Sequence, residues 1–481
     1  MCMTNTKSQT CFFVPGGFWS KLVLLPCIFC LLSIVANEAI AKTNSKKPNI
    51  VVILSDDAGY RDFGFQGSDE MLTPNIDAIA KQGVSYSRAY VTTPFCSPSR
   101  AGLLTGRYPQ RFGYEFNLTD EKLPGVDSKY IGLDVDERTI ADYLKAKGYT
   151  TIAIGKWHLG NKIHFHPNHR GFDQFYGILG GGSNYHPHQL RFRKSIMRNN
   201  KYVVPKEYLT DDFAREAINY IKAVKSPFFL YLAFNAVHTP MDVRKEDLQR
   251  FSHIADFQRQ RLAAMTWAMD RAIGNVMNTL KEHHDPSNTL VIFTNDNGGD
   301  RIGIGADNSP LRGSKGGLLE GGIRVPFVMS WPGKLPNNTQ DNRTVSLLDV
   351  VPTALEAANI KIPSDIDGQS LFKTDKSRRL YWNYDVTAAI MDGDWKLIRF
   401  PDRLPQLYDL SKDIGEKHDL SSAHPEKVSK LLKQLFSWEG EMQHPRWNTG
   451  SYWTREDIMR YDEDYIKAQN AAARERLRSE Q

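Results

Sequence analysis

The sequence predicts an α/β fold in which helices cover a large, mostly parallel β-sheet. Apolar runs rich in β-branched and aromatic residues at 48–55, 150–154, 228–234 and 289–294 have the composition of strands buried on both faces. Residues 73–83, 139–147 and 255–284, which lie between these runs, carry apolar side chains at helical spacing. Strands that alternate with helices are typical of parallel sheets, in which each crossover is helical.

The first of these helices has recognisable ends. Thr73 or Asn75 can cap its N-terminus, Pro74 fits the first turn, and Gly83 can end the helix. Residues 84–91 follow directly and are predicted to form a further strand.

The last part of the chain has a different character. Short strand-like runs occur between 380 and 400, an amphipathic helix is predicted over 426–438, and the chain beyond about 440 is rich in charge and tryptophan. We therefore expect a main domain over residues 48–365 and a smaller α+β domain over residues 366–481. The smaller domain is expected to hold a small antiparallel sheet, a helix and a wrapping tail.

Composition excludes several classes of protein. Of the 481 residues, 41% are hydrophobic and 24% are charged, which excludes a disordered or collagen-like chain. Lys and Arg number 61 against 55 Asp and Glu, so the formal net charge is +6. This mild excess over a long chain does not indicate nucleic-acid binding, and we expect no nucleic-acid partner.

The N-terminus resembles a secretory signal peptide. An apolar run at 22–35 follows Lys7 and Lys21 and precedes Ala39 and Ala41, which form an A-x-A cleavage pattern. We expect cleavage after Ala41, so that residues 1–41 are removed. The run is short for a membrane span of about 20 residues, although a retained anchor helix is the alternative. The expected product is exported, periplasmic or secreted, and has no stable membrane insertion.

Removal of residues 1–41 would leave a single cysteine. Four of the five cysteines precede residue 31, and the fifth is Cys96. A lone cysteine in an exported chain is a buried thiol, an intermolecular partner or a residue kept for its chemistry. An exported chain without internal disulfides also favours a bacterial, periplasmic enzyme over an animal one.

Polar residues follow three of the predicted buried strands. Asp56 and Asp57 follow 48–55, His238 follows 228–234, and Asp296 and Asn297 follow 289–294. Sites in open α/β sheets lie beyond the carboxyl ends of strands. Three carboxylates and one amide suit a hard divalent cation, calcium before magnesium. Each group alone is equally compatible with a solvated turn.

The surroundings of Cys96 carry a specific motif. The sequence Pro-Phe-Cys-Ser-Pro-Ser-Arg ends at Arg100 and is followed by Leu-Thr-Gly-Arg, which ends at Arg107. This pattern resembles the signature of the type I sulfatases, in which a formylglycine-generating enzyme converts the cysteine to Cα-formylglycine. Further segments match the family in the same order: Asp56-Asp57, Lys156-Trp-His158, His238 before Thr-Pro, Asp296-Asn297-Gly, Leu311-Arg-Gly-Ser-Lys315-Gly and Glu320-Gly-Gly-Ile-Arg-Val-Pro326.

This resemblance covers most of the chain after residue 41. It is closest to the arylsulfatase and N-acetylgalactosamine-6-sulfatase-like branch. It implies an alkaline-phosphatase-like α/β fold and a calcium ion, and its calcium ligands correspond here to Asp56, Asp57, Asp296 and Asn297. Cys96, as formylglycine, would be the nucleophile and a further neighbour of the metal.

The family chemistry needs two hydroxyl groups on one carbon. In the family that this sequence resembles, one hydroxyl of the hydrated aldehyde attacks sulfur and the alcohol leaves. The second hydroxyl is then deprotonated and sulfate is eliminated. Arg100 and Lys156 would hold these hydroxyls and lower their pKa. His158 would take the proton during elimination. His238 and Lys315 would contact the ester oxygen and the sulfate, as general acid and sulfate clamp.

Some of these residues are also compatible with a purely structural role. Lys156, next to Trp157, is compatible with an aliphatic stem lying along the surface, and His238 with a stabilised loop. The loop at 180–188 falls where the family places a substrate contact, which His186 would supply here. The histidine-rich segment 164–173 could hold a second metal, but we interpret it as mostly structural. The basic residues Arg191, Arg193, Lys194 and Arg198 form either a solvated face or a surface that steers a polyanion.

The sequence therefore predicts an exported, calcium-dependent formylglycine sulfatase. Its expected substrate is a sulfated carbohydrate, either an algal polysaccharide fragment or a glycosaminoglycan. One alternative is a phosphodiesterase or phosphonate monoester hydrolase, which shares the fold and the metal ligands. The other is a non-catalytic protein that binds sulfated glycans.

Overall fold

The computed structural model describes residues 46–118, 126–189, 195–225, 227–373, 378–448 and 451–479. The predicted signal peptide therefore lies outside the described residues, as do Arg191, Arg193 and Lys194. Residues 47–481 pack as one compact unit. The boundary at residue 365 stays a prediction.

The main sheet is mixed, with a parallel centre. Its hydrogen-bonded order is β11-β2-β10-β8-β1-β7-β3-β4-β5-β6, with β9 paired to β2. The central strands β8 (Thr289–Asn295), β1 (Asn49–Ser55), β7 (Phe228–Ala233), β3 (Thr150–Lys156) and β4 (Gln174–Ile178) are all parallel. The remaining strands are β2 (Gly83–Tyr90), β5 (Ile196–Arg198), β6 (Lys201–Val203), β9 (Arg324–Val325), β10 (Phe327–Ser330) and β11 (Thr339–Ser346). This arrangement confirms the predicted fold class.

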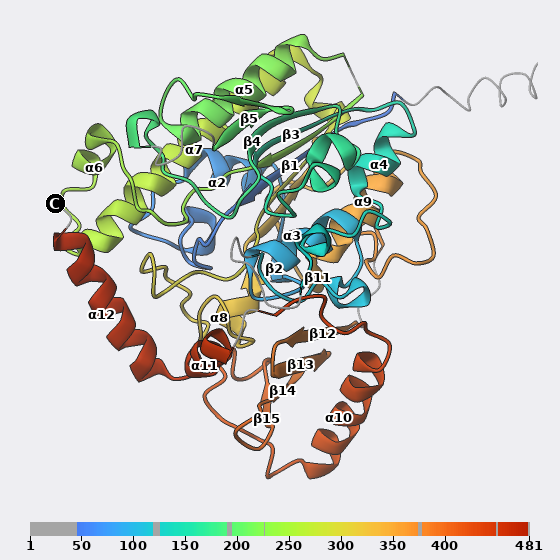
Figure 1. The fold of residues 1–481 in the computed structure, drawn as a ribbon, viewed down its shortest axis with the longest axis vertical. Coiled ribbons are helices and arrows are strands. Elements are labelled where there is room, and N and C mark those ends of the chain that lie inside the picture. Colours follow the sequence, from blue (N-terminus) through green and yellow to red (C-terminus); the bar gives the residue numbers. More distant parts are fainter. Residues whose placement is uncertain are drawn as a thin grey trace, which may run out of the picture. The chain divides into compact units, whose positions relative to one another are not determined.

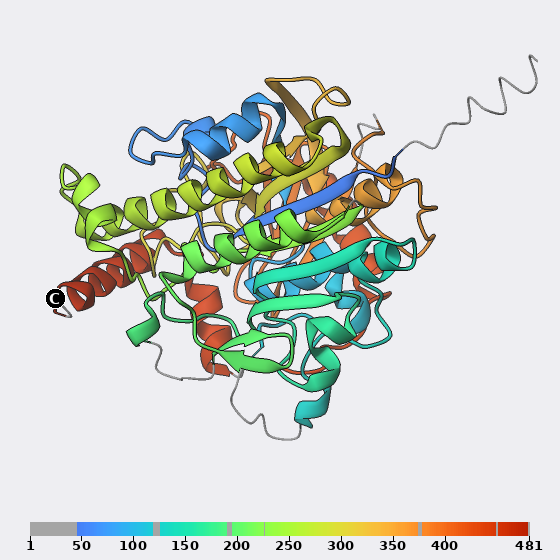
Figure 2. The same cartoon turned by 90° about the horizontal axis from the view of Figure 1, so that it is seen from above.

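Helices cover both faces of the sheet (Figures 1 and 2). One face carries α2 (Pro74–Lys81), α5 (Leu209–Ala223) and α7 (Phe257–His283), with α6 (Lys245–Arg250) against α7. The other carries α3 (Cys96–Thr105), α4 (Ile140–Lys145) and α9 (Val350–Ala357), and the short α8 (Glu320–Ile323) precedes β9. Within the described residues, no helix combines the length and the apolar character that a membrane crossing requires.

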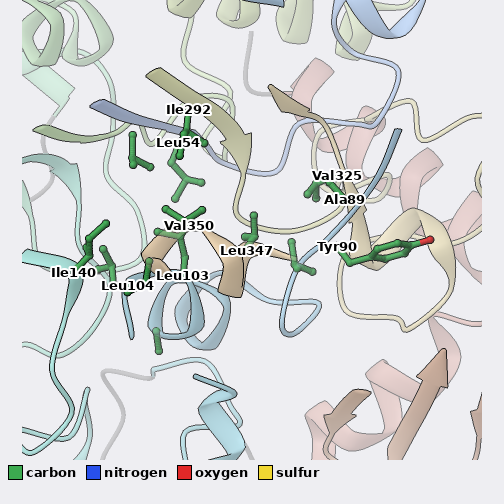
Figure 3. Packing of buried hydrophobic residues seen from close by; sticks show 14 of the residues in the cluster. Leu54, Ala89, Tyr90, Leu103, Leu104, Ile140, Ile292, Val325, Leu347 and Val350 are labelled. Atoms are coloured by element: carbon green, nitrogen blue, oxygen red, sulfur yellow. The ribbon is translucent and has the colours of Figure 1, made fainter. Parts of the chain in front are cut away.

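Strand β1 shows why the apolar runs are continuous. Val51 and Ile53 pack into the core beneath α2, α5 and α7, whereas Val52 and Leu54 pack into the core on the α3 side. Every residue of β1 is buried, because successive side chains point to opposite covered faces. Figure 3 shows the α3 side, where Leu54 lies among side chains of α3, α4 and α9.

The C-terminal part forms a second sheet. Strands β12 (Arg379–Tyr384), β13 (Thr387–Asp392), β14 (Trp395–Arg399) and β15 (Gln406–Asp409) pair antiparallel in this order. Helix α10 (Pro425–Glu439) packs Leu431 and Leu435 against this sheet. Helices α11 (Ser451–Met459) and α12 (Glu463–Ser479) follow and run back towards the main sheet (Figure 1).

A buried ion-pair network joins the two sheets. Lys396 of β14 is fully buried, and its Nζ lies 2.9 Å from Glu320 Oε1 and 2.9 Å from Glu416 Oε1. Glu320 also pairs with Arg324 and accepts a hydrogen bond from the Tyr90 hydroxyl. Removing one partner of such a buried network costs about 3–5 kcal/mol, because the other charges stay desolvated. The network therefore fixes the C-terminal sheet against the segment that begins at Glu320.

Two buried carboxyl groups beside the C-terminal sheet make stability depend on pH. Burial raises the pKa of Glu115 to about 8 and that of Asp457 to about 7. The folded chain then holds protons that the unfolded chain releases above its own lower pKa values. The contribution of these two groups to stability is therefore full below about pH 4 and declines as the pH rises towards 8. We expect this contribution to lower the unfolding midpoint by several degrees between pH 5 and pH 8, relative to a chain that lacks the two carboxyl groups.

The variant Glu115→Gln should flatten this dependence, because glutamine has no proton to lose. Thermal unfolding followed by fluorescence at pH 5, 6, 7 and 8 measures the slope. Glu426→Gln, which changes an exposed carboxyl group on α10, serves as control and should keep the wild-type slope. An unchanged slope in Glu115→Gln would contradict the assignment.

Candidate active site

The predicted site residues meet at one edge of the sheet. Asp56 follows β1, His238 follows β7, and Asp296 follows β8, and these neighbouring strands are parallel. Ligand-capable atoms of Asp56, Asp57, Cys96 and His238 all lie within 4.8 Å of one another. Parallel strands place their carboxyl ends together, which explains why residues far apart in the sequence converge here.

Cys96 is the first residue of α3. The residue is 1% exposed, and its thiol donates to Asp56 Oδ1 at a distance of 3.6 Å. Burial raises the pKa of the thiol well above its usual value, although Lys156 and Lys315 act against this. An unmodified Cys96 is therefore protonated at neutral pH and is a poor nucleophile. This environment is consistent with a residue that acts after chemical conversion.

Three buried cations surround Cys96. Arg100 lies one helical turn further along α3, and its guanidinium donates to Asp296 Oδ2 at 2.7 and 2.9 Å. Lys156 Nζ lies 2.5 Å from Asp56 Oδ2, and Lys315 Nζ lies 2.6 Å from Asp57 Oδ1. All three side chains are at most 9% exposed. Lys156 is thus buried beside Asp56, and the alternative that its side chain lies along the surface is wrong.

The carboxylates and lysines stabilise one another's charge. Burial, the largest single effect, would raise the pKa of Asp57, but Lys315, His238 and Lys156 together outweigh it and hold the pKa well below the ordinary value. Burial would likewise lower the pKa of Lys315, but Asp57 and the other nearby groups together hold it well above 10.5. For Asp296 burial prevails and the pKa is raised, with the charge of Asp56 acting in the same direction. Lys315 therefore keeps its positive charge at neutral pH.

Two oxygen atoms in the site lack a hydrogen-bond donor. Asp296 Oδ1 and Asn297 Oδ1 are buried and have no partner among the described residues. Asn297 donates its Nδ2 to Asp57 Oδ1 at 2.8 Å, so its own oxygen is left available. Buried acceptors without donors are costly unless another group binds them. Together with Asp56 and Asp57 they form an oxygen-rich donor set that fits a divalent metal ion.

The two predicted histidines differ in exposure and contacts. His158 is 7% exposed, and burial followed by the charge of Lys156 lowers its pKa well below 6.5. His238 is 23% exposed, and its Nε2 lies 3.6 Å from Asp57 Oδ2. Its Nδ1 faces the Thr239 carbonyl at 2.7 Å, so Nδ1 carries the proton and Nε2 faces the cluster. Burial lowers the pKa of His238 to about 4, and both imidazoles are neutral at pH 7.

A glycine-rich loop approaches both histidines. A Cβ atom at Gly181 would lie 2.8 Å from His158 Nε2, and one at Gly182 would lie 3.5 Å from His238 Nδ1. Only a residue without a side chain allows the backbone at position 181 to come this close. Asp57 and His158 themselves adopt positive φ angles of 67° and 55°, a conformation that is costly for residues other than glycine and that clusters at functional sites.

The described contacts of His186 are away from the cluster. Its Nε2 lies 3.1 Å from the Val243 carbonyl, and its ring packs against His188 and Tyr208. A substrate contact by His186 stays a prediction. The neighbouring Tyr185 is buried, and its hydroxyl lies 2.6 Å from the Asn235 carbonyl and 2.8 Å from the His238 carbonyl. No sequence pattern indicated this supporting role, since the contacts join residues about fifty positions apart.

The other segments considered in the sequence analysis have structural partners. His166 is 2% exposed and its Nε2 lies 2.9 Å from the Asn199 carbonyl. None of the histidines at 164–169 belongs to a metal-ligand group in the part of the chain that the structure describes. Arg198 pairs with Glu216 at 2.7 Å and lies over the Tyr176 ring.

The variant Tyr185→Phe tests the support of His238. Phenylalanine keeps the packing but removes the donor to the His238 carbonyl, which is worth about 0.5–1.5 kcal/mol. We expect kcat/KM for a sulfate ester to fall by about 3- to 10-fold with little change in the unfolding midpoint. Tyr149→Phe is the matched control, because Tyr149 is buried and its hydroxyl has no partner among the described residues. Equal rates in the two variants would show that the Tyr185 hydroxyl does not position His238.

Comparison with known proteins agrees with this geometry. The family model described as Sulfatase matches residues 48–360, and the model described as N-sulphoglucosamine sulphohydrolase, C-terminal, matches residues 314–440. The N-acetylgalactosamine-6-sulfatase of Canis lupus familiaris is 32% identical over 446 residues, which cover 80% of this chain and 84% of the relative.

Solved structures show the same fold. The crystal structure of Ps i-CgsB in complex with k-i-k-neocarrahexaose is 36% identical, has a TM-score of 0.79, and is matched over 87% of this chain and all of that chain. The phosphonate monoester hydrolase of Agrobacterium radiobacter is 19% identical with a TM-score of 0.59, over 82% of this chain and 96% of that chain, and shares the fold alone. With the Sulfatase model matched across its main sheet, this chain belongs to the sulfatase family and is a sulfuric ester hydrolase.

Proposed function

We propose that this protein hydrolyses sulfate esters of a sulfated carbohydrate, with residue 96 converted to formylglycine and calcium as the metal. The observation that carries the proposal is the position of Cys96, buried at the start of α3 and facing Asp56 among Arg100, Lys156 and Lys315. A sulfate ester is an anion, and a pocket with three buried cations can neutralise its charge as it reacts.

One group of side chains in the site is proposed to bind the metal. Asp56, Asp57, Asp296 and Asn297 would hold the metal, with residue 96 beside it. The bound metal would supply a positive charge that polarises the reacting oxygen atoms. Calcium is favoured over magnesium because the protein offers several oxygen donors from the segments that follow β1 and β8, whereas magnesium prefers a strict octahedron and keeps its waters.

The chain's own residues handle protons and sulfate. Arg100 and Lys156 would hold the hydroxyl groups of residue 96 and lower their pKa through adjacent positive charge. Lys315 would clamp the sulfate. His238 is the more exposed histidine, so it would meet the ester oxygen. The negative charge of the bound sulfate ester would favour a proton on Nε2, the nitrogen that faces the cluster, and this proton would let His238 act as general acid. His158 is buried and neutral, so it can accept the proton that is released when sulfate is eliminated.

The substrate is proposed from similarity. The structure at 36% identity was solved with a neocarrahexaose, whereas the N-acetylgalactosamine-6-sulfatase is 32% identical. We therefore place an algal, carrageenan-type polysaccharide fragment ahead of a glycosaminoglycan. Export to the periplasm or the medium is supported by the charged, apolar and A-x-A segments of residues 1–41 and by the single cysteine that remains after them.

The first experiment is a mass measurement on the peptide that carries residue 96. The chain is expressed with a formylglycine-generating enzyme, and conversion lowers the peptide mass by about 18 Da relative to the cysteine form, because a thiol is exchanged for an aldehyde. An unchanged mass in a sample co-expressed with an active enzyme would remove the proposed nucleophile.

The second experiment compares substrates. The converted protein is expected to hydrolyse an aryl sulfate faster than an aryl phosphodiester, and to release sulfate from carrageenan oligosaccharides faster than from chondroitin fragments. Faster phosphodiester turnover would favour the phosphonate monoester hydrolase alternative. Tight binding of sulfated glycans without release of sulfate would favour the non-catalytic alternative.

A further inference from the structure

A separate cavity lies at the far end of α3 from Cys96. Helix α3 begins at Cys96 and ends at Thr105, and ten residues at 1.5 Å per residue span about 15 Å. Beyond this end, a cavity of about 380 Å³ is lined by residues of the 3₁₀ helix Pro109–Phe112, the segment before β12, β12 itself, β13 and α10. We call it the α10 pocket. Pockets of roughly 300 Å³ and above hold small ligands, so one sugar residue fits here.

Aromatic rings form one wall of the α10 pocket. Tyr381 and Trp438 stack with ring centroids 5.1 Å apart and an interplanar angle of 5°. Tyr108 packs its edge against Trp438 at 5.2 Å. Aromatic side chains present a flat apolar surface together with a polar edge. This combination suits the apolar face and the hydroxyl groups of a pyranose ring.

One donor in this wall has no acceptor. Trp438 is 6% exposed, and its indole Nε1 is buried without a hydrogen-bond partner among the described residues. Leaving such a donor unpaired costs about 1–3 kcal/mol. The nitrogen is closed to the cavity as the side chains stand, so a sugar would contact the aromatic rings of this wall rather than this donor.

Guanidinium groups also line the α10 pocket. Arg378 bonds Asp349 Oδ1 at 2.6 Å through Nη1, and its other donors have no protein partner among the described residues. Arg379 is 48% exposed at the rim, where its Nε lies 3.2 Å from Asp392. Guanidinium groups bind planar or tetrahedral oxyanions through paired hydrogen bonds. A sulfate group on the sugar would therefore meet guanidinium N–H donors in the α10 pocket.

We propose that the α10 pocket is a second carbohydrate-binding site, which holds a sulfated sugar residue of the polymer without cleaving it. The inference rests on the proposed substrate class. None of the residues that surround Cys96 lines the pocket, so it contributes binding and no chemistry. A chain held at two points has a higher effective concentration at the catalytic cluster than one held at a single point. The site would thus favour long substrates over short ones.

The test is binding to a sulfated polymer without turnover. The full chain carrying Cys96→Ala is run through gels that contain carrageenan or neutral agarose, and retardation gives an apparent dissociation constant. The variant pair Arg379→Ala and Trp438→Phe removes a rim cation and replaces the indole of the aromatic wall with a smaller ring. We expect the apparent dissociation constant for carrageenan to rise at least 5-fold, and agarose to retard neither protein.

The matched control pair is Arg403→Ala and Trp331→Phe. Arg403 is likewise about half exposed and paired with a neighbouring aspartate, and Trp331 is 8% exposed, but neither lines the α10 pocket. Both double variants should keep their unfolding midpoints within a few degrees of each other. Equal retardation of the two pairs would overturn the proposal. Agarose binding as strong as carrageenan binding would overturn the recognition of sulfate.

A kinetic measurement separates this proposal from the proposed function. In converted protein without Cys96→Ala, the α10-pocket pair should keep the wild-type rate on a short aryl sulfate and raise KM for the polymer several-fold. A loss of rate on both substrates would assign the pocket a structural role and overturn the inference. If the wild type releases no sulfate but carrageenan binding still depends on Arg379 and Trp438, the proposed function fails and the second binding site stands.

Discussion

Replacement of Cys96 by alanine is expected to lower kcat/KM for sulfate-ester hydrolysis by at least about 10,000-fold, the scale on which enzymes lose activity when a nucleophile is removed. The physical reason is that alanine cannot be converted to formylglycine, so the cations that face residue 96 have no reactive group to activate. The fold should persist, since the side chain only shrinks by one sulfur atom. Initial rates on an aryl sulfate, measured with thermal unfolding, give both quantities.

Ser99→Ala is the matched control for this variant. Ser99 lies on the same helix, is fully buried, and its hydroxyl has no partner among the described residues. Loss of an unpaired hydroxyl is close to neutral, so activity should stay within about 3-fold of the wild type. A Cys96→Ala chain that keeps more than one part in a hundred of the wild-type rate would show that residue 96 is not the nucleophile.

Replacement of Asp57 by asparagine is expected to remove the bound metal and to lower kcat/KM by about 1,000-fold. Asp57 joins Lys315, His238 and Asn297, so its loss weakens the proposed ligand set and leaves the ammonium group of Lys315 without its carboxylate. An unpaired buried charge destabilises by about 3–5 kcal/mol. The measurement is metal content per chain by atomic emission after dialysis, at a temperature well below the unfolding midpoint.

Asp62→Asn separates loss of metal from loss of stability. Asp62 is fully buried and paired with Arg259 at 2.8 Å, outside the catalytic cluster. This variant should lose stability but keep one metal ion per chain, and a chelator should lower its unfolding midpoint as it does for the wild type. Asp57→Asn should show no response to the chelator. Full metal content in Asp57→Asn would rule out Asp57 as a ligand.

The sequence predicted β8, β1, β7 and β3 because they are apolar runs buried on both faces, but it did not predict β4 (Gln174–Ile178). It did not predict β11, whose residues Thr339–Ser346 are mostly polar and lie at the edge of the sheet, where one side is open. Helix α3 was also missed. It contains Pro98 and Gly102 and is buried all round, so it has no amphipathic period to detect. Pro98 is accepted because it lies in the first turn, where backbone N–H groups have no partner within the helix.

The residues of the candidate site likewise include some that the sequence predicted and some that it did not. Asp56, Asp57, Asp296 and Asn297 could be proposed because they directly follow predicted strands, and the strand order alone then brings them together. Lys315 and Arg100 follow no strand, and only the family motif indicated them. The hydrogen bond from the Tyr185 hydroxyl to the His238 carbonyl could not be predicted from the sequence, because it depends on how two loops pack in space.

The burial of Cys96 has a consequence for the order of events during biosynthesis. With 1% of the residue exposed, no converting enzyme can reach its sulfur once α3 has packed against the sheet. If residue 96 is converted to formylglycine as proposed, conversion and folding compete for the same newly made chain, and in a molecule that folds first residue 96 stays a thiol. The specific activity of a preparation then reflects the fraction of chains that were converted before they folded. The conditions of co-expression, rather than later treatment of the folded protein, decide this fraction.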